Sequence, residues 1–310
     1  MVLRAEDELM HPHTSIREWR ESMWYCFDMP EYEMGGALYY SYMPNGDTPS
    51  ARLIMYITRG WNREPNTLLY HFDQTFPIPE GDWDDLDVAG IARFKRIEPL
   101  KAWEISFNDG KRLDFSIDVD LYAGNWHYID NFFETPKFLA GDRYHRPYAA
   151  KGKMTLDGKD YPLDFLGDSD HSWGPRRWEP LYKSKYIAGQ CGRDFAFSFI
   201  EIEGIDGGLR PYGFVWDGQK MSAITKVEIA PLYDEDGLHR SVAMNITDDE
   251  ARITRVDGTC FASAPTEFDT IWNNDNYCTF EIDGGRLKGS GILSFFWNRD
   301  YFHRVMRRGR

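Results

Sequence analysis

The sequence is poor in cysteine and has no long apolar segment, and both features exclude classes of protein. The four cysteines, Cys26, Cys191, Cys260 and Cys278, lie far apart in 310 residues and form no Cys-x-x-Cys pair. We therefore expect reduced thiols and no zinc site. No segment approaches the roughly 20 apolar residues of a membrane helix. Met1–Met10 has scattered charges and no apolar stretch suited to a signal peptide, so a cytoplasmic protein is predicted.

Motifs for nucleotide cofactors are also missing. The sequence has no Gly-x-Gly-x-x-Gly between a strand and a helix, no Walker loop and no Gly-x-Ser-x-Gly elbow. It has 36 Lys and Arg against 50 Asp and Glu, a formal charge of −14, which argues against a nucleic-acid partner. No compact spacing of His, Cys and carboxylates suggests a metal site. We expect no cofactor and no metal.

Aromatic residues, in contrast, are abundant at 16%, which favours strands and an aromatic-lined cavity. Short runs with a period of two predict strands at 37–42, 52–58, 67–72, 111–119, 151–156, 194–201, 225–229, 241–246 and 286–296. Asp-Gly dipeptides, typical of tight turns, stand at positions 109, 157, 206, 217, 236, 257 and 283. Thr14–Met23 could begin with a capping box and form a short helix, and the acidic segment 77–90 is interpreted as a solvated loop. These patterns predict an all-β protein of antiparallel sheets or barrels.

Chemistry-bearing residues are most concentrated in the segment Gly167–Trp178, called the signature below. It contains Asp168, Asp170, His171, two arginines and two tryptophans. Asp170 and His171 suggest an acid–base couple, since a nearby carboxylate raises the pKa of an imidazole. Gly174-Pro175 is expected to end any regular element. The alternative is a polar corner in which these side chains only satisfy turns and backbone groups.

The run Asp170-His171-Ser172-Trp173-Gly174 resembles the His-Asp-His-Asn-Trp-Gly motif of the carotenoid 1,2-hydratase family. It is more similar still to the Arg-Asp-His-Ser-Trp-Gly motif of a bacterial branch of that superfamily, to which the AttH-like proteins are related. The resemblance implies two lipocalin-like β-barrels, covering residues 1–166 and 167–310, with the signature at their seam. The family's functional His and Trp correspond to His171 and Trp173. Its downstream Tyr-x-Asp matches only loosely, at Phe199 and Glu201, and its first His is Ser169 here.

Two other segments contribute candidate site residues. In the segment 124–130, Trp126 and His127 could line the mouth of the first barrel or belong to an ordinary loop. Alternation places Phe199 and Glu201 on one strand face, where burial would raise the pKa of the carboxyl group. The predicted catalytic residues are Asp170, His171 and Glu201. The predicted substrate-binding residues are Trp173, Trp178, Phe199, Trp126, His127, Tyr144 and Arg176.

These residues suggest a cofactor-free lyase or isomerase of the hydratase–dehydratase or cyclase type. A protonated Glu201 would act opposite Asp170 and His171, and indole rings would stabilise a cation on a terpenoid, steroid or polyketide-like substrate. The alternative is a carrier that holds an apolar small molecule without changing it. A pH titration would discriminate the enzyme from the carrier, because only an enzyme needs an acidic group with a shifted pKa in its cavity. Association into a homodimer is compatible with the sequence.

Overall fold

The computed structural model describes residues 3–178, 181, 183–203, 208–268 and 270–307. Strands make up 62% of the structure and helices 7%. The chain forms one nearly closed and one closed antiparallel β-barrel, which confirms the predicted fold class. Among the described residues, no helix has the length and apolar character needed to cross a membrane.

The N-terminal sheet has the strand order β4-β3-β2-β1-β11-β10-β8-β7-β6-β5, and β9 pairs with β10. Its strands are β1 (Trp19–Met29), β2 (Met34–Met43), β3 (Ser50–Arg59), β4 (Tyr70–Phe76), β5 (Asp85–Val88), β6 (Ala92–Glu98), β7 (Ala102–Asn108), β8 (Leu113–Asp120), β9 (Trp126–His127), β10 (Asp142–Leu156) and β11 (Lys159–Pro175). Short 3₁₀ turns occupy Ala5–Glu8, Pro30–Tyr32, Pro65–Thr67 and Tyr128–Asp130. The inner face of the sheet encloses an aromatic and aliphatic core.

The C-terminal barrel closes in the order β12 to β19. Its strands are β12 (Lys183–Gln190), β13 (Ala196–Glu203), β14 (Leu209–Trp216), β15 (Met221–Tyr233), β16 (His239–Asp248), β17 (Ile253–Phe268), β18 (Ile271–Ile282) and β19 (Leu287–Asn298). A short α-helix, Arg299–Tyr301, continues into a π-helical turn, Phe302–Met306. Phe302 stacks on Trp272 with ring centroids 4.6 Å apart, so this end of the chain packs against the barrel core.

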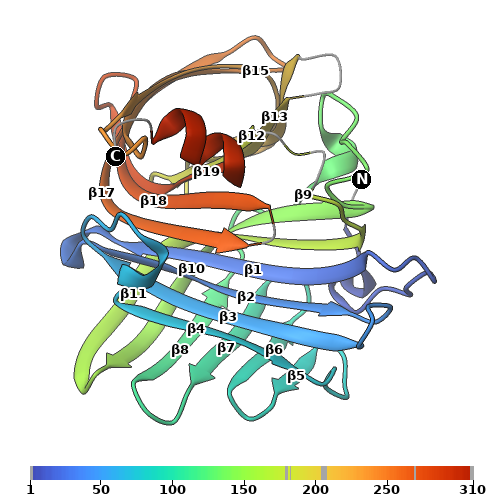
Figure 1. The fold of residues 1–310 in the computed structure, drawn as a ribbon. Helices are drawn as coiled ribbons and strands as arrows, with labels where there is room; N and C mark the ends of the chain where they lie inside the picture. The colour runs from blue at the N-terminus through green and yellow to red at the C-terminus, as the bar shows by residue number, and fades with distance from the viewer. Residues whose placement is uncertain (1–2, 179–180, 182, 204–207, 269, 308–310) are drawn as a thin grey trace.

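The two barrels pack face to face, with β17 and β18 over the strands β1–β3 (Figure 1). A third buried cluster fills this interface and includes Ala37, Tyr56, Tyr186 and Tyr277. Gly35 allows the closest approach, because a Cβ atom there would lie 2.1 Å from the ring of Tyr277. The interface is therefore a close-packed surface around the cavity described below.

Several local predictions were wrong. Residues 17–18 form a turn and Trp19 begins β1, so no helix covers Thr14–Met23; pairing of β1 with β2 and β11 prevails over the local capping pattern. The segment 77–90 contains β5, paired with β6. Asp257-Gly258 lies inside β17, where a Cβ on Gly258 would meet Phe280 at 2.8 Å, so close packing explains this glycine. Of the other Asp-Gly dipeptides, 206–207 lie outside the described residues and the rest stand between consecutive strands.

Residues 167–175 of the signature form the C-terminal half of β11, which ends at Pro175, as expected for Gly174-Pro175. β11 continues without interruption past residue 166, and it pairs with β10 as far as Trp173 and with β1 as far as Pro175. The change from the first sheet to the second therefore falls between Pro175 and Lys183. The signature lies at the interface, as part of the N-terminal sheet.

Candidate functional site

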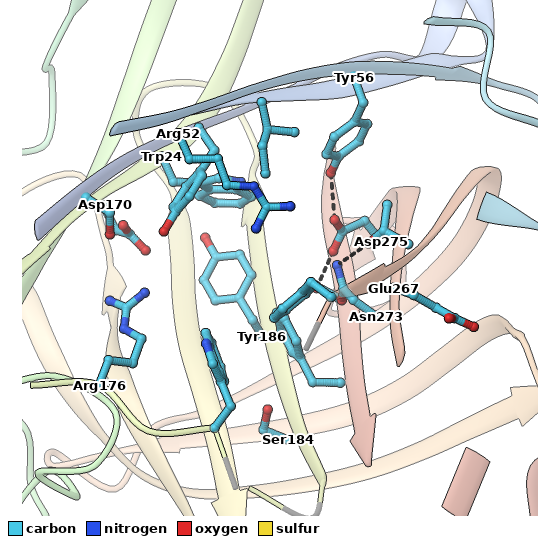
Figure 2. A pocket seen from close by; sticks show the side chains of 18 of the residues that line it. Trp24, Arg52, Tyr56, Asp170, Arg176, Ser184, Tyr186, Glu267, Asn273 and Asp275 are labelled. Atoms are coloured by element: carbon cyan, nitrogen blue, oxygen red, sulfur yellow. Dashed lines mark hydrogen bonds between the residues drawn. The ribbon is translucent and has the colours of Figure 1, made fainter. Parts of the chain in front are cut away.

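A cavity of about 320 Å³ lies between the barrels. The N-terminal sheet contributes the outward-facing side chains of β1, β2, β3, β4, β10 and β11, and the C-terminal barrel contributes side chains of β12, β13, β17, β18 and β19. Both sets face the cavity in Figure 2. A cavity at such a seam is a common place for a ligand site.

Aromatic rings form much of the cavity wall. Trp24 and Tyr186 meet edge to face at 5.2 Å. Trp178 meets Phe268 edge to face at 5.4 Å and stacks with Phe296 at 6.4 Å. Trp178 and Arg176, two of the predicted substrate-binding residues, line this cavity. Such walls suit an apolar ligand and would stabilise a developing cation.

One buried carboxylic acid on the cavity wall is Asp275 of β18 (Figure 2). Its Oδ2 accepts a hydrogen bond from the Tyr56 hydroxyl at 2.6 Å, and its Oδ1 accepts one from Ser294. Tyr56 and Tyr277 lie 3.0 Å apart between their hydroxyl oxygens. Burial raises the pKa of Asp275, although the hydrogen bonds from Ser294 and Tyr56 oppose the rise. Asp275 thus has the property expected of Glu201, a carboxyl group that keeps its proton to higher pH.

A second polar network reaches the cavity through Tyr186. The Tyr186 hydroxyl donates to Asp168, whose Oδ2 also lies 2.9 Å from His145 Nδ1. The other ring nitrogen of His145 lies 3.0 Å from the Tyr128 hydroxyl. Asp168 is fully buried, and its Oδ1 has no hydrogen-bond partner among the described groups. A hydroxyl on the cavity wall is thereby coupled to a buried carboxylate and imidazole, an arrangement suited to moving a proton.

Asp170 and His171 do not act on a common ligand, because adjacent residues of a strand point to opposite faces. Asp170 lines the cavity and pairs with Arg143. His171 points into the N-terminal barrel and is fully buried. Its Nε2 lies 2.6 Å from Glu21 Oε1, and its Nδ1 lies 2.8 Å from the Tyr144 hydroxyl. The predicted couple of Asp170 and His171 is therefore split between two compartments.

His11, Glu21 and His171 form one group of potential metal ligands, with ligand atoms within 4.8 Å of one another. The Glu21 carboxylate already lies within hydrogen-bonding distance of five donors, from His11, Tyr42, Trp83 and His171. Burial raises the pKa of Glu21, but the hydrogen bonds from His11 and His171 outweigh burial and bring it to about 2. Burial lowers the pKa of His171. These features fit a buried carboxylate whose acceptor positions are filled by donors of this chain.

Glu201 lies inside the C-terminal barrel, beyond the cavity wall. It shares a strand face with Phe197 and Phe199, as predicted, and that face points inward. Lys185 of the neighbouring strand forms an ion pair with it. Glu201 is therefore not placed opposite Asp170 and His171, because β13 turns its odd-numbered residues away from the interface.

The remaining predicted binding residues do not line the cavity either. Trp173 stacks on His11 at 3.6 Å and Tyr144 contacts His171, both inside the first barrel. Phe199 belongs to the core of the second barrel. Trp126 packs on Phe214, and His127 lies 3.2 Å from a carboxylate oxygen of Asp142, near the interface.

Asp275 was missed by sequence reasoning, although a signal for it exists. Asn273–Asn276 is a run of four polar residues inside a strand, and all four are buried. Buried polar side chains in a strand require partners, so such a run indicates a hydrogen-bonded site. Its partner Ser294 lies opposite it on the next strand, β19, whereas Tyr56 comes from β3, 219 positions away, and gives no local signal.

A family model described as "Domain of unknown function (DUF7064)" matches residues 4–299. A candidate AttH protein (NE1406) of Nitrosomonas europaea has a similar structure, with TM-score 0.64, 13% identity and coverage of 95% of this chain and 96% of that one. The structure of CghA with Sch210972 gives TM-score 0.57 and 12% identity, covering 90% and 88%. Kievitone hydratase from Nectria haematococca gives TM-score 0.57 and 12% identity, covering 91% and 90%. No curated protein matches the sequence significantly. At these identities the likeness shows a common fold.

Proposed function

Because the chain belongs to the DUF7064 family and shares its fold with a hydratase, we propose that it is a lyase or isomerase that works by acid–base chemistry. The substrate would be a largely apolar molecule of terpenoid, steroid or polyketide type, bound between the two barrels. The reaction would be hydration, dehydration or cyclisation without a redox step, in keeping with the lack of nucleotide-binding motifs in the sequence.

Asp275 is the observation that carries this proposal. A neutral carboxyl group on an aromatic cavity wall can donate a proton to an alkene or a leaving hydroxyl group. Trp24, Trp178 and Tyr186 then face the positive charge that develops on carbon. Tyr186, hydrogen-bonded to Asp168, would accept or deliver a proton at a second position. The reaction therefore has one acid and one separate proton acceptor in the same cavity.

Two neighbours support the proposal. One is a hydratase by name, and the structure of the other is that of CghA with Sch210972. A carrier that stores its ligand unchanged would also use an aromatic cavity, but it has no need for a buried acid whose pKa is raised.

The test begins with the ligand that co-purifies with the protein, identified by mass spectrometry after denaturation. The wild type, incubated with this compound in D₂O, should incorporate deuterium at carbon or change the compound's mass by one water. Asp275→Asn should fold and bind but react about 10²–10⁴-fold more slowly. Asp73→Asn, which removes another cavity-lining carboxylate from its ion pair with Arg52, is the matched control and should react normally. Unchanged ligand with the wild type would favour the carrier, and normal turnover by Asp275→Asn would remove the proposed acid.

A further inference from the structure

Four arginines, Arg20, Arg52, Arg143 and Arg176, line the same cavity as Asp170, and Arg52 is paired with Asp73. Asp170 is paired with Arg143. Figure 2 shows Arg176 and Asp170 on one side of the cavity and Asp275 on the other. The cavity is thus cationic at one end and carries the buried acid at the other.

Arg20 and Arg176 have only neutral partners within the described chain. Arg176 Nε donates to the Leu139 carbonyl at 2.9 Å, and its Nη2 donates to Ser172. Arg20 makes long contacts of 3.5 Å with the Tyr39 hydroxyl and 3.7 Å with Met43 sulfur. Neither has a carboxylate oxygen within 4 Å in the described residues. Buried or half-buried cations without a counter-charge are costly, which indicates a place for an anion.

The pKa values of Arg176 and Tyr39 are both shifted by the positive charge of the neighbouring arginines. Burial lowers the pKa of Arg176 to about 10, and the charges of Arg20 and Arg143 act in the same direction, while Tyr39 and Asp170 oppose them. Burial alone would raise the pKa of Tyr39, but Arg20 and Arg176 reverse this and bring it to about 8. This local excess of positive charge occurs in a chain whose net charge is −14.

A second cavity, of about 330 Å³, adjoins the first at Arg20, Arg176 and Trp178. Its other lining residues include the exposed Arg17 and Asp47. The two unpaired guanidinium groups therefore stand between the outer cavity and the aromatic one. A ligand held there would place its charged end toward the outer cavity and its apolar body toward Asp275.

We propose that the substrate carries one anionic group, a carboxylate or an ionised enol, which binds between Arg20 and Arg176. The apolar body then lies along Trp24, Trp178 and Tyr186, and the reacting carbon reaches Asp275. This inference rests on the proposed function for the identity of the cavity as the active site. It adds a chemical class: acidic apolar molecules are substrates, and their neutral analogues are not.

The test uses two fluorescent probes with the same aromatic body. 8-Anilinonaphthalene-1-sulfonate carries one anionic group, and N-phenyl-1-naphthylamine lacks it. The wild type should bind the anionic probe at least about tenfold more tightly, since a charge-assisted contact contributes about 1.5–3 kcal/mol and about 1.4 kcal/mol is tenfold. Arg20→Gln and Arg176→Gln should each lose about tenfold for the anionic probe and keep their affinity for the neutral one. Arg93→Gln is the matched control for the loss of one positive charge, because Arg93 is exposed and is not among the residues that line either cavity.

Equal affinity of the wild type for both probes would overturn the proposal. So would normal binding of the anionic probe by both Arg20→Gln and Arg176→Gln, or an equal loss of both probes in the two variants. If one variant does not fold, the other still decides, because the two arginines come from different segments. Asp275→Asn should bind both probes like the wild type, so failure of the anion site and failure of the catalytic proposal are distinguishable.

Discussion

Replacing Glu21 by glutamine removes a buried negative charge from the first barrel and keeps the side-chain shape. Glu21 Oε1 lies 2.9 Å from His11 Nδ1, 2.6 Å from His171 Nε2 and 3.3 Å from Trp83 Nε1. Glutamine retains one carbonyl oxygen for these donors. Its NH₂ group faces the Tyr42 hydroxyl and the His11 amide, which now lack an acceptor.

The magnitude follows from the pKa of Glu21, which is about 2 in the folded protein against an ordinary value of 4.5. A difference of about 2.5, at about 1.4 kcal/mol per pH unit, gives roughly 3 kcal/mol of stability at neutral pH. Because the folded-state pKa is depressed, this stabilisation is complete above about pH 5 and is lost as pH falls toward 2. No screening correction is needed, since the carboxylate is fully buried.

The assay is urea unfolding followed by tryptophan fluorescence, for wild type and Glu21→Gln at pH 7 and pH 3. We expect the variant to be less stable by about 3 kcal/mol at pH 7, and the gap to shrink by about 2 kcal/mol at pH 3. Comparing the two proteins at each pH cancels the other carboxylates, which titrate alike in both. A gap of constant size at both pH values would refute a charged Glu21 in the folded protein.

Three further predictions concern the interface, the second barrel and metal binding. Gly35→Ala should lower the unfolding midpoint by inserting a methyl group into the ring of Tyr277, at a cost of about 1–3 kcal/mol in calorimetry or urea unfolding; an unchanged midpoint would contradict the close packing of the barrels. Glu201→Gln should leave probe binding and turnover unchanged but destabilise the protein by about 3 kcal/mol, because Lys185 loses its buried partner. Slower turnover by a variant that is as stable as the wild type would instead indicate a catalytic role for Glu201. Chelation should leave the thermal midpoint unchanged, because donors of this chain already occupy the Glu21 carboxylate, and a lower midpoint after chelation would reveal a bound metal.

The local sequence was sufficient to predict the fold class. Alternating aromatic strands and turn dipeptides are short-range features, and they predicted antiparallel sheets or barrels because a hairpin is specified by residues close in sequence. The expectation of two barrels came from the resemblance of the signature to the carotenoid 1,2-hydratase family. The same local evidence misled at Thr14–Met23, where the capping pattern competes with pairing to β2 and β11. As a strand, the segment from Trp19 forms backbone hydrogen bonds with a neighbouring strand on each side. A single short helix offers fewer stabilising contacts.

The site depended on information that is not local. The sequence drew attention to Asp170 and Arg176, which line the cavity, and to His171, which does not. Nothing in the signature itself distinguishes these positions until it is known to be a strand. Once β11 is extended, the period of two sends Asp170 to the interface and His171 into the first barrel.

The partners of the buried acid could be found only in the folded chain. Asp275 meets Tyr56 across 219 positions of sequence, and its pKa rises because two barrels together exclude water from it. Composition and periodicity determine that such barrels form. Which polar side chains face each other in the seam is decided by strand register and by the docking of the two sheets, and these depend on contacts between distant residues.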